Sequence, residues 1–569
     1  MTEKSPTTPP ATGDDTAPLN PERRRVLGGI ALAGAALTLG SCRPLTYATA
    51  ESASSAPPTT ALDALLRKHI QHVVVLYAEN RSFNNLFAGF PGLAQPLAQL
   101  QPTDYQQRDR DGSLLQTLPP IWGGLVRRGQ TVNQRYYKIG EQAIRGLANQ
   151  PFALSAPDGT LLPHAVVTRD LVHRFYENQL QINGGKNDRF VAWGNTGAMV
   201  MGHYEDNASN LQLWQLAQQY TLCDNFFMGA FGGSFLNHQY LVAAQPPFYP
   251  HADQSPSKLH VATLEGTDPK GTRPKLADDS PASAMQGRAK FATPDTLTPD
   301  FWAVNTMGPA YAPGFTRDTT DPTLADASNG YTLPPQTHLT IGDALSAKGV
   351  DWAWYSGGWQ AALDGHGGEE PDQGPPVSPN FQPHHQPLNY FHQFAPGTTA
   401  RAQHLRDAGL GSDASTNHFI AAIEAGSLPP VAFYKPQGDL NMHAGYSSVA
   451  AGDQHLAQVI DALQKSPLWP ELLVVITVDE NGGWWDHVAP PKGDRWGPGT
   501  RVPALVVSPH ARKGFIDHTI YDTGSILRFI TRRFGLKKLP GLELRDAAMV
   551  AAGGPSPGDL TAALHFDVS

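Results

Sequence analysis

The chain is poor in cysteine, in charge and in long apolar runs. It holds two cysteines in 569 residues, and charged residues make up 16% of it. Two cysteines form one disulfide at most, which excludes a disulfide-stabilised scaffold. The sparse charge, together with 55 glycines and 50 prolines, excludes a coiled coil and indicates a loop-rich globular protein. The net charge of −9 gives no reason to expect a nucleic acid as partner.

No apolar run is long enough to cross a bilayer comfortably, so we expect no transmembrane span in the mature chain. A moderate run at about 26–39 follows Arg23–Arg25. Paired arginines before a short apolar stretch are typical of a twin-arginine export signal, which we predict for residues 1–50. Ala48–Ala50 resembles a cleavage site, and a lipoprotein box ending at Cys42 is the alternative. We therefore expect an exported protein, periplasmic or secreted, with a lipid anchor at Cys42 in the second case.

The rest of the chain predicts one α/β domain. Residues 51–66 are predicted as a linker, and residues 67–569 as a single domain with an irregular insertion at about 251–335. Short valine-rich runs predict buried strands at 72–80, 429–436, 471–480 and 501–511. Helices are predicted between the later runs, at 416–427 and 452–467. Strands that alternate with helices predict a mostly parallel central sheet sandwiched by helices, with long loop insertions.

Oxygen-bearing side chains follow two of these runs. Glu79 and Asn80 end the first run, and Asp479 and Glu480 end a late one. If both strands are parallel, the side chains lie at the same edge of the sheet. Hard divalent cations prefer oxygen ligands, and burying carboxylates without a partner is costly. The pattern favours a metal site, with Gly482–Gly483 allowing a tight turn beside it; solvated strand caps are the alternative.

Two further features have the chemistry of a phosphoryl-transfer site. The adjacent pair His384–His385 lies between prolines, and imidazoles suit phosphate binding and leaving-group protonation. Thr196 lies in Gly-Asn-Thr-Gly before a short apolar segment, near an expected helix N-terminus that favours an anion. A metal-bound threonine loses its proton more easily and attacks phosphorus. The alternative is that Asn195 or Thr196 only caps a helix.

Four ordered blocks resemble a known family. They are HVVVLYAENRSFNNLFAGFPG (72–92), INGGKNDRF (182–190), VVITVDENGGWWDHVAPP (474–491) and GPGTRVPALVVSP (497–509). They resemble the bacterial phosphoesterase family of phosphocholine-type phospholipases C and respiratory-burst-inhibiting acid phosphatases, from about residue 70 to 540. This resemblance implies the alkaline-phosphatase-like fold, a central sheet between helices. One position departs from the family pattern, because Asn84 stands where the family has aspartate.

The resemblance also implies roles for particular residues. It implies one divalent metal ion (Ca²⁺, Mg²⁺, Mn²⁺ or Zn²⁺) held by Glu79, Asn80, Thr196, Asp479 and Glu480. Thr196 is then the nucleophile. Catalytic roles are implied for His385 and His443, and substrate contacts for Asn237, His238 and His384. His173 is a further, weaker match, and Asp486 and His487 match a family block in either a functional or a structural role.

The histidine segments QPHHQPLNYF and NMHAGYSS resemble the acid phosphatase branch. We therefore expect an exported acid phosphatase that cleaves phosphomonoesters through a covalent phosphothreonine, with an acid optimum if its histidines act as cations. A phospholipase C or other phosphodiesterase is the first alternative. A non-catalytic binding protein of the cell envelope is the second, motivated by Asn84 and by the lipid anchor at Cys42.

Overall fold

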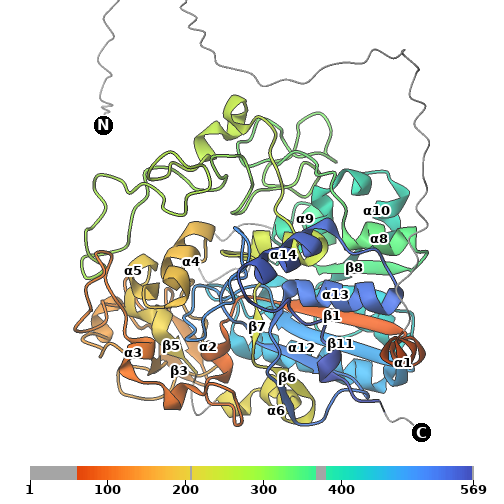
Figure 1. Ribbon diagram of the computed structural model, residues 1–569, viewed down its shortest axis with the longest axis horizontal. Helices are drawn as coiled ribbons and strands as arrows, with labels where there is room; N and C mark the ends of the chain where they lie inside the picture. The colour runs from red at the N-terminus through yellow and green to blue at the C-terminus, as the bar shows by residue number, and fades with distance from the viewer. Residues whose placement is uncertain (1–59, 205–207, 367–379, 567–569) are drawn as a thin grey trace, which may run out of the picture. The chain divides into compact units, whose positions relative to one another are not determined.

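An eight-stranded sheet is the centre of the fold (Figure 1). The computed structural model describes residues 60–204, 208–366 and 380–566. The strand order is β13-β6-β12-β11-β1-β10-β8-β9. The strands are β1 (His72–Ala78), β6 (Thr221–Cys223), β8 (Trp352–Gly357), β9 (Leu405–Gly409), β10 (Val431–Lys435), β11 (Leu472–Val478), β12 (Ala504–Val507) and β13 (Phe515–Asp517). Only β12 runs antiparallel to its neighbours within this sheet, so the predicted mostly parallel sheet is confirmed.

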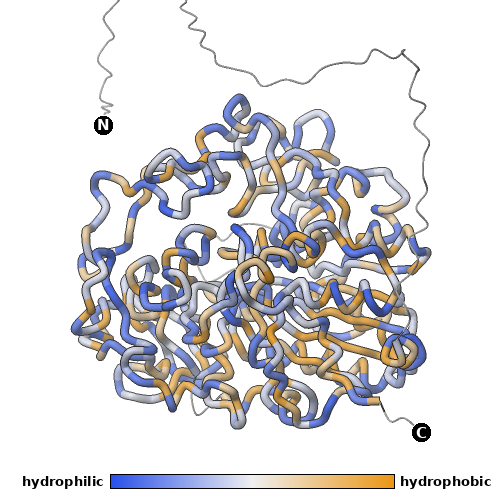
Figure 2. Tube along the Cα trace, in the orientation of Figure 1, coloured by the Kyte–Doolittle hydropathy of each residue, from blue (hydrophilic) through white to orange (hydrophobic). Residues whose placement is uncertain are grey.

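The central strands read as continuous apolar runs because both faces of the sheet are covered. Every residue of β11 is buried, and only His72 of β1 is partly exposed. Parallel strands between helix layers have this composition, and their β-branched side chains favour the extended backbone. The hydropathy colouring of Figure 2 follows the same pattern, with hydrophobic residues concentrated along the strands.

Two groups of helices flank this sheet. In one group, α12 (Val449–Lys465) contacts α6 (Gln212–Gln219) and α11 (His418–Glu424). In the other, α13 (Thr523–Phe534) contacts α1 (Ala61–His69) and α7 (Ser234–Ala243). The helix α12 buries Leu456, Val459, Ile460 and Leu463, at the spacing that predicted it. Both helices predicted between the late strands are therefore confirmed.

The N-terminal boundary of the described chain differs from the prediction. The helix α1 begins within the predicted linker 51–66, because Thr60 and Asp63 form a capping box and Leu66 is buried. The predicted export signal, its cleavage site and Cys42 lie outside the described residues. Cys223 is a buried free thiol. None of the described helices has the length and hydrophobicity needed to cross a bilayer.

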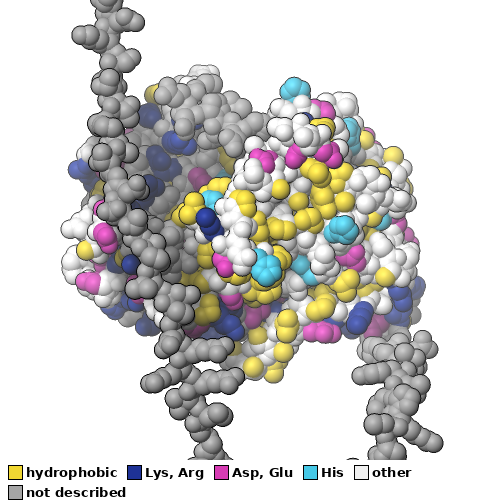
Figure 3. All heavy atoms as spheres, turned by 90° about the horizontal axis from the view of Figure 1, so that it is seen from above, with side chains coloured by type: hydrophobic (Ala, Val, Ile, Leu, Met, Phe, Trp, Pro, Cys, Tyr) yellow, Lys and Arg dark blue, Asp and Glu magenta, His cyan; other side chains and the backbone are white. Residues whose placement is uncertain are grey.

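The segment predicted as an irregular insertion has little regular structure. It begins with two short turns, η6 (Ala252–Gln254) and η7 (Pro256–His260). From there to α8 (Ile341–Ala347) the described chain has isolated bridges but no helix or strand. These loops lie at the top of Figure 1. Figure 3 views the molecule from that side, where hydrophobic side chains cover much of the described surface with histidine and acidic side chains among them.

Candidate active site

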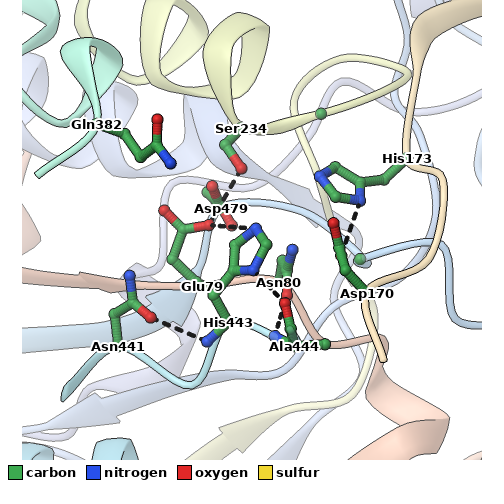
Figure 4. A network of polar contacts seen from close by, with 12 residues as sticks. Glu79, Asn80, Asp170, His173, Ser234, Gln382, Asn441, His443, Ala444 and Asp479 are labelled. Atoms are coloured by element: carbon green, nitrogen blue, oxygen red, sulfur yellow. Dashed lines mark hydrogen bonds and ion pairs between the residues drawn. The ribbon is translucent and has the colours of Figure 1, made fainter. Parts of the chain in front are cut away.

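Three carboxylates meet at one edge of the sheet. The strands β1 and β11 are neighbours with Ala78 opposite Val478, so Glu79 emerges beside Asp479 and Glu480. All three side chains are fully buried. Figure 4 shows Glu79, Asn80 and Asp479 grouped at this edge. The predicted meeting of residues 400 positions apart is therefore confirmed.

A buried lysine accompanies the carboxylates. Lys435 is the last residue of β10, on the other side of β1, and its Nζ lies 2.6 Å from Oε1 of Glu79. His385 Nε2 lies 2.9 Å from the same oxygen. Burial alone would raise the pKa of Glu79, but Lys435 and His385 outweigh it and hold the pKa well below its usual range. Glu79 is thus an anion whose Oε2 remains for other partners.

The charges of the other two carboxylates are less well compensated, because burial outweighs the cations near them. Burial, and then the charge of Glu79, raise the pKa of Asp479 well above its usual range. Burial also raises the pKa of Glu480, to about 7, although His173 opposes the shift. Asp479 Oδ2 is buried with no hydrogen-bond partner among the described residues. A divalent cation would remove this electrostatic cost, so the oxygen atoms present fit a metal ion.

Histidine nitrogens extend this ligand chemistry. Ligand atoms of Glu79, His384 and His385 lie within 4.8 Å of one another, as do those of Glu79, His238 and Asp479. The mixed oxygen and nitrogen donors fit several divalent metals and do not select one.

The turn after β11 requires glycine. Gly482 has φ +59°, and a Cβ there would lie 2.2 Å from the carbonyl oxygen of Asn80. Its N–H donates to Oε2 of Glu480 at 2.5 Å. The predicted tight turn is confirmed, and it fixes the Glu480 carboxylate.

Ser234 places a hydroxyl next to the buried carboxylates. It is the first residue of α7, and its Oγ donates to Glu79 Oε2 at 3.1 Å and lies 3.3 Å from Glu480 Oε1. Gly232, two residues earlier, has φ +95°, where a Cβ would lie 2.6 Å from the backbone nitrogen of Phe175. The Gly-Gly-Ser sequence therefore makes the turn that places a hydroxyl at a helix N-terminus. The sequence motifs did not single out Ser234, although its glycine pair before a helix is a signal for such a turn.

Asn237 holds the same turn from inside α7. Its side-chain amide donates to the carbonyls of Ala230 and Gly233, and its Oδ1 accepts from the N–H of Ala230. The residue is fully buried. These bonds suit a residue that positions Ser234, rather than the substrate ligand that the resemblance implied.

Thr196 forms no hydrogen bond with this group of carboxylates. It precedes the short turn η4 (Gly197–Met201), and its buried Oγ1 has no hydrogen-bond partner among the described residues. Its neighbour Asn195 lines the cavity described below, but Thr196 does not. The Thr196 hydroxyl thus makes no hydrogen bond to the carboxylates, whereas the hydroxyl of Ser234, which also follows a glycine before a helical segment, lies within hydrogen-bond distance of two.

Ser234 lines a cavity of about 1000 Å³. His173, His384 and His443 lie on its wall with Ser234. Figure 4 shows His443 directed toward Glu79, whose Oε2 lies 3.8 Å from His443 Nε2. His173 Nε2 lies 3.8 Å from Oε1 of Glu480. The cavity wall thus carries a hydroxyl and three imidazoles, and Ser234, His443 and His173 contact the buried carboxylates next to it.

Two other predicted histidines contact the site without lining the cavity. His238 and His385 are fully buried and are not on the described wall. His238 Nδ1 lies 2.8 Å from the carbonyl oxygen of Ser234 and 3.7 Å from Asp479 Oδ2. These contacts and the His385–Glu79 contact suit residues that position the carboxylates and the turn, instead of the substrate-binding and catalytic roles implied by the resemblance.

The wall histidines differ in charge. Burial lowers the pKa of His443 and lowers that of His384 well below its usual range, so both rings are neutral near pH 7. Burial acts the same way on His173, but Glu480 and Asp170 outweigh it and raise the pKa of His173 to about 9. His173 is therefore a cation, and the structure gives no support to an acid optimum set by His384 and His443.

The position that departs from the family pattern lies in a structural network. The N–H of Asn84 donates to Asp486 at 2.9 Å, and its Oδ1 accepts from Arg501 at 3.2 Å and contacts His487 at 3.1 Å. Arg501 also donates to Asp486 at 3.0 Å. None of these four residues lines the described cavity wall. Asp486 and His487 thus tie together the loops that follow β1 and β11.

The sheet and its edge of buried carboxylates define an α/β protein with a candidate metal centre. The sequence model of the Phosphoesterase family matches residues 70–537, so the chain belongs to this family.

Its relatives include phospholipases C. The non-hemolytic phospholipase C of Pseudomonas aeruginosa is 27% identical over 271 residues, 42% of this chain and 34% of that protein. The enzyme of the same name from Burkholderia pseudomallei is 22% identical over 541 residues, 88% of this chain and 59% of that protein. The chain therefore spans less than two thirds of either relative. Among solved structures, a protein of the alkaline phosphatase superfamily from Vibrio parahaemolyticus matches with 12% identity and a TM-score of 0.27, over 59% of this chain and 62% of that one.

Proposed function

We propose that the chain is a metal-dependent phosphoric ester hydrolase whose nucleophile is Ser234. One observation carries this proposal. The Ser234 hydroxyl lies within hydrogen-bond distance of two buried carboxylates, at a helix N-terminus on the wall of a cavity. Membership of the Phosphoesterase family supports the same chemistry. Ser234 replaces Thr196 in this proposal, because the hydroxyl of Thr196 contacts none of these groups.

The residues Glu79, Asn80, Asp479 and Glu480 would hold the metal. A bound divalent ion supplies Lewis acidity that lowers the pKa of a hydroxyl it ligates and offsets charge on phosphate. Residues of the chain orient the nucleophile and face the phosphate. Glu79 and Glu480 orient Ser234 Oγ, and the N-terminal N–H groups of α7 face the anion that approaches it.

The reaction then has two steps. Ser234 Oγ passes its proton to Glu480 and forms a bond to phosphorus while the bond to the leaving oxygen breaks. The leaving oxygen takes up a proton, which gives a phosphoserine and an alcohol. Water next cleaves the phosphoserine, releases phosphate and restores the serine. His173 is the wall histidine that is charged near pH 7, so it stabilises negative charge on the phosphoryl oxygens. His384 and His443 act as neutral hydrogen-bonding groups, and either one accepts a proton from the attacking water.

The substrate remains divided between two classes within this proposal. The histidine segments favour phosphomonoesters, which makes an acid phosphatase the first candidate. A phospholipase C is the second, favoured by the names of the relatives and by a cavity at the upper end of the size range for ligand sites, which has room for a second ester substituent. A non-catalytic binding protein is disfavoured, because the site is complete and Asn84 lies outside the cavity wall.

A pair of matched variants tests the nucleophile. Both Ser234→Ala and Thr196→Ala remove one buried hydroxyl, and each is assayed in the full chain with p-nitrophenyl phosphate and p-nitrophenylphosphorylcholine. We expect Ser234→Ala to lower kcat by a factor of about 1000 or more, as loss of a nucleophile does. Thr196→Ala is expected to keep the activity. The reverse pattern would return the nucleophile to Thr196, and turnover of the choline diester alone would promote the phospholipase C candidate.

A further inference from the structure

Four arginines line the cavity that contains Ser234. They are Arg127, Arg169, Arg174 and Arg317, and together they are called the arginine wall below. Arg317 comes from the irregular insertion, whereas the other three precede α4 (Phe175–Ile182) in the chain. Among the described residues that line the cavity, Asp170 is the one carboxylate. Basic residues thus outnumber acidic ones around the space that a substrate enters.

Two members of the arginine wall are held by hydrogen bonds to backbone carbonyls, and Asp170 is the carboxylate that acts on the charge of Arg169. Arg169 donates to the carbonyl oxygens of Gly123 and Gly124. Arg317 donates to the carbonyl oxygens of Ala362 and Leu363. Backbone carbonyls orient a guanidinium without cancelling its net charge, so these bonds place positive charge at fixed positions on the wall.

The remaining members differ from each other. Arg174 forms an ion pair with Asp295 and lies 3.9 Å from Glu177, so its charge is compensated. Arg127 is exposed and lies near Arg169: burial lowers the pKa of Arg169, and the charge of Arg127 lowers it further. Arg127 and Arg169 thus place two guanidinium groups near each other on the wall.

We propose that the arginine wall selects phosphate esters whose leaving group carries a second oxyanion, a carboxylate or a further phosphate; this inference rests on the hydrolase function proposed above. Guanidinium groups bind both oxyanions through paired N–H donors. A leaving group with a quaternary ammonium needs aromatic faces or carboxylates around it. The wall has Phe235, Phe315, Phe381 and Tyr446, but Tyr446 already stacks on His443, and guanidinium groups repel a choline cation.

Three monoesters of primary alcohols isolate this charge effect. Phosphocholine, glycerol 3-phosphate and 3-phosphoglycerate present a cationic, a neutral and an anionic leaving group to the same nucleophile. We expect kcat/KM to rise in that order at low ionic strength, by about tenfold or more from the neutral to the anionic ester. Added salt is expected to shrink the ratio. Fructose 1,6-bisphosphate compared with fructose 6-phosphate repeats the test with a second phosphate and so distinguishes the two oxyanions.

Charge-neutral variants assign the preference to the wall. Arg317→Gln and Arg127→Gln are each expected to lower the ratio of kcat/KM for 3-phosphoglycerate to that for glycerol 3-phosphate, by about threefold or more. Arg317 and Arg127 are exposed, so both variants are expected to fold. The matched control is Arg273→Gln, an exposed arginine of the insertion that does not line the described cavity, and it is expected to leave the ratio unchanged.

The outcomes separate this inference from the function on which it rests. A rising series that flattens in the two wall variants supports the inference, whether the carboxylate or the phosphate is preferred. Equal turnover of the three esters, or a preference for phosphocholine, overturns the inference and leaves the hydrolase function standing. No turnover of any ester with divalent metal supplied overturns both.

Discussion

The ion pair between Lys435 and Glu79 makes a quantitative prediction. Both side chains are fully buried, and Nζ lies 2.6 Å from Oε1. Lys435→Met keeps the length of the side chain and removes its charge, which leaves Glu79 as a buried anion with His385 as its neutral partner. Removing one member of a buried pair costs about 3–5 kcal/mol. We therefore expect Lys435→Met to unfold at a clearly lower urea concentration than the parent, with a chelator present.

The assay is urea unfolding followed by the fluorescence of the 11 tryptophans. It is done at pH 8, because burial and then Lys435 lower the pKa of His385, so that removal of Lys435 takes away one of these causes, and a high pH keeps the ring from taking up a compensating proton. The double variant Lys435→Met with Glu79→Gln is expected to recover part of the loss, since no unpaired charge remains. Lys465→Met, which breaks an exposed ion pair with Asp461, is the control. An unchanged midpoint for Lys435→Met would refute the ionised buried pair.

Two more predictions concern the metal and the departure from the family pattern. Glu480 has a pKa of about 7 without a metal, so protons compete with the metal for its carboxylate below pH 7. The affinity for the metal should therefore fall by about tenfold per pH unit for each proton displaced. Calorimetric titration of a divalent metal from pH 5 to 8 checks this, and a pH-independent affinity contradicts it. Asn84→Asp restores the residue typical of the family in a network outside the cavity wall, and should leave kcat/KM unchanged. A large gain in turnover would instead place Asn84 in the site.

The sheet was predictable because the apolar composition of its strands shows that both of their faces are buried. Runs such as LLVVITV fit a strand covered on both faces, and the helical spacing of α12 fits a helix on that sheet. The order of the strands was not predictable from these runs, because β1 pairs with β10 and β11 from the far end of the chain. Turn residues and local periodicity carry no information about such long-range neighbours.

The site was predictable where a residue continues a strand. Glu79, Asp479 and Glu480 could be placed at one edge by the geometry of a parallel sheet. Lys435 ends β10 at that edge in the same way and was open to the same reasoning, but was overlooked.

The choice of Ser234 as the proposed nucleophile was not predictable from local sequence. Thr196 and Ser234 both follow a glycine-containing turn before a helical segment. Only the fold shows which of these turns faces the carboxylates.

The most direct test of the account is to identify the residue that carries the phosphoryl group during turnover. The full chain, loaded with divalent metal, is mixed with a phosphate ester at pH 8, quenched within milliseconds and digested for mass spectrometry. The account predicts a phosphorylated peptide containing Ser234, absent from Ser234→Ala. A phosphopeptide containing Thr196, with Ser234 unmodified, would contradict it.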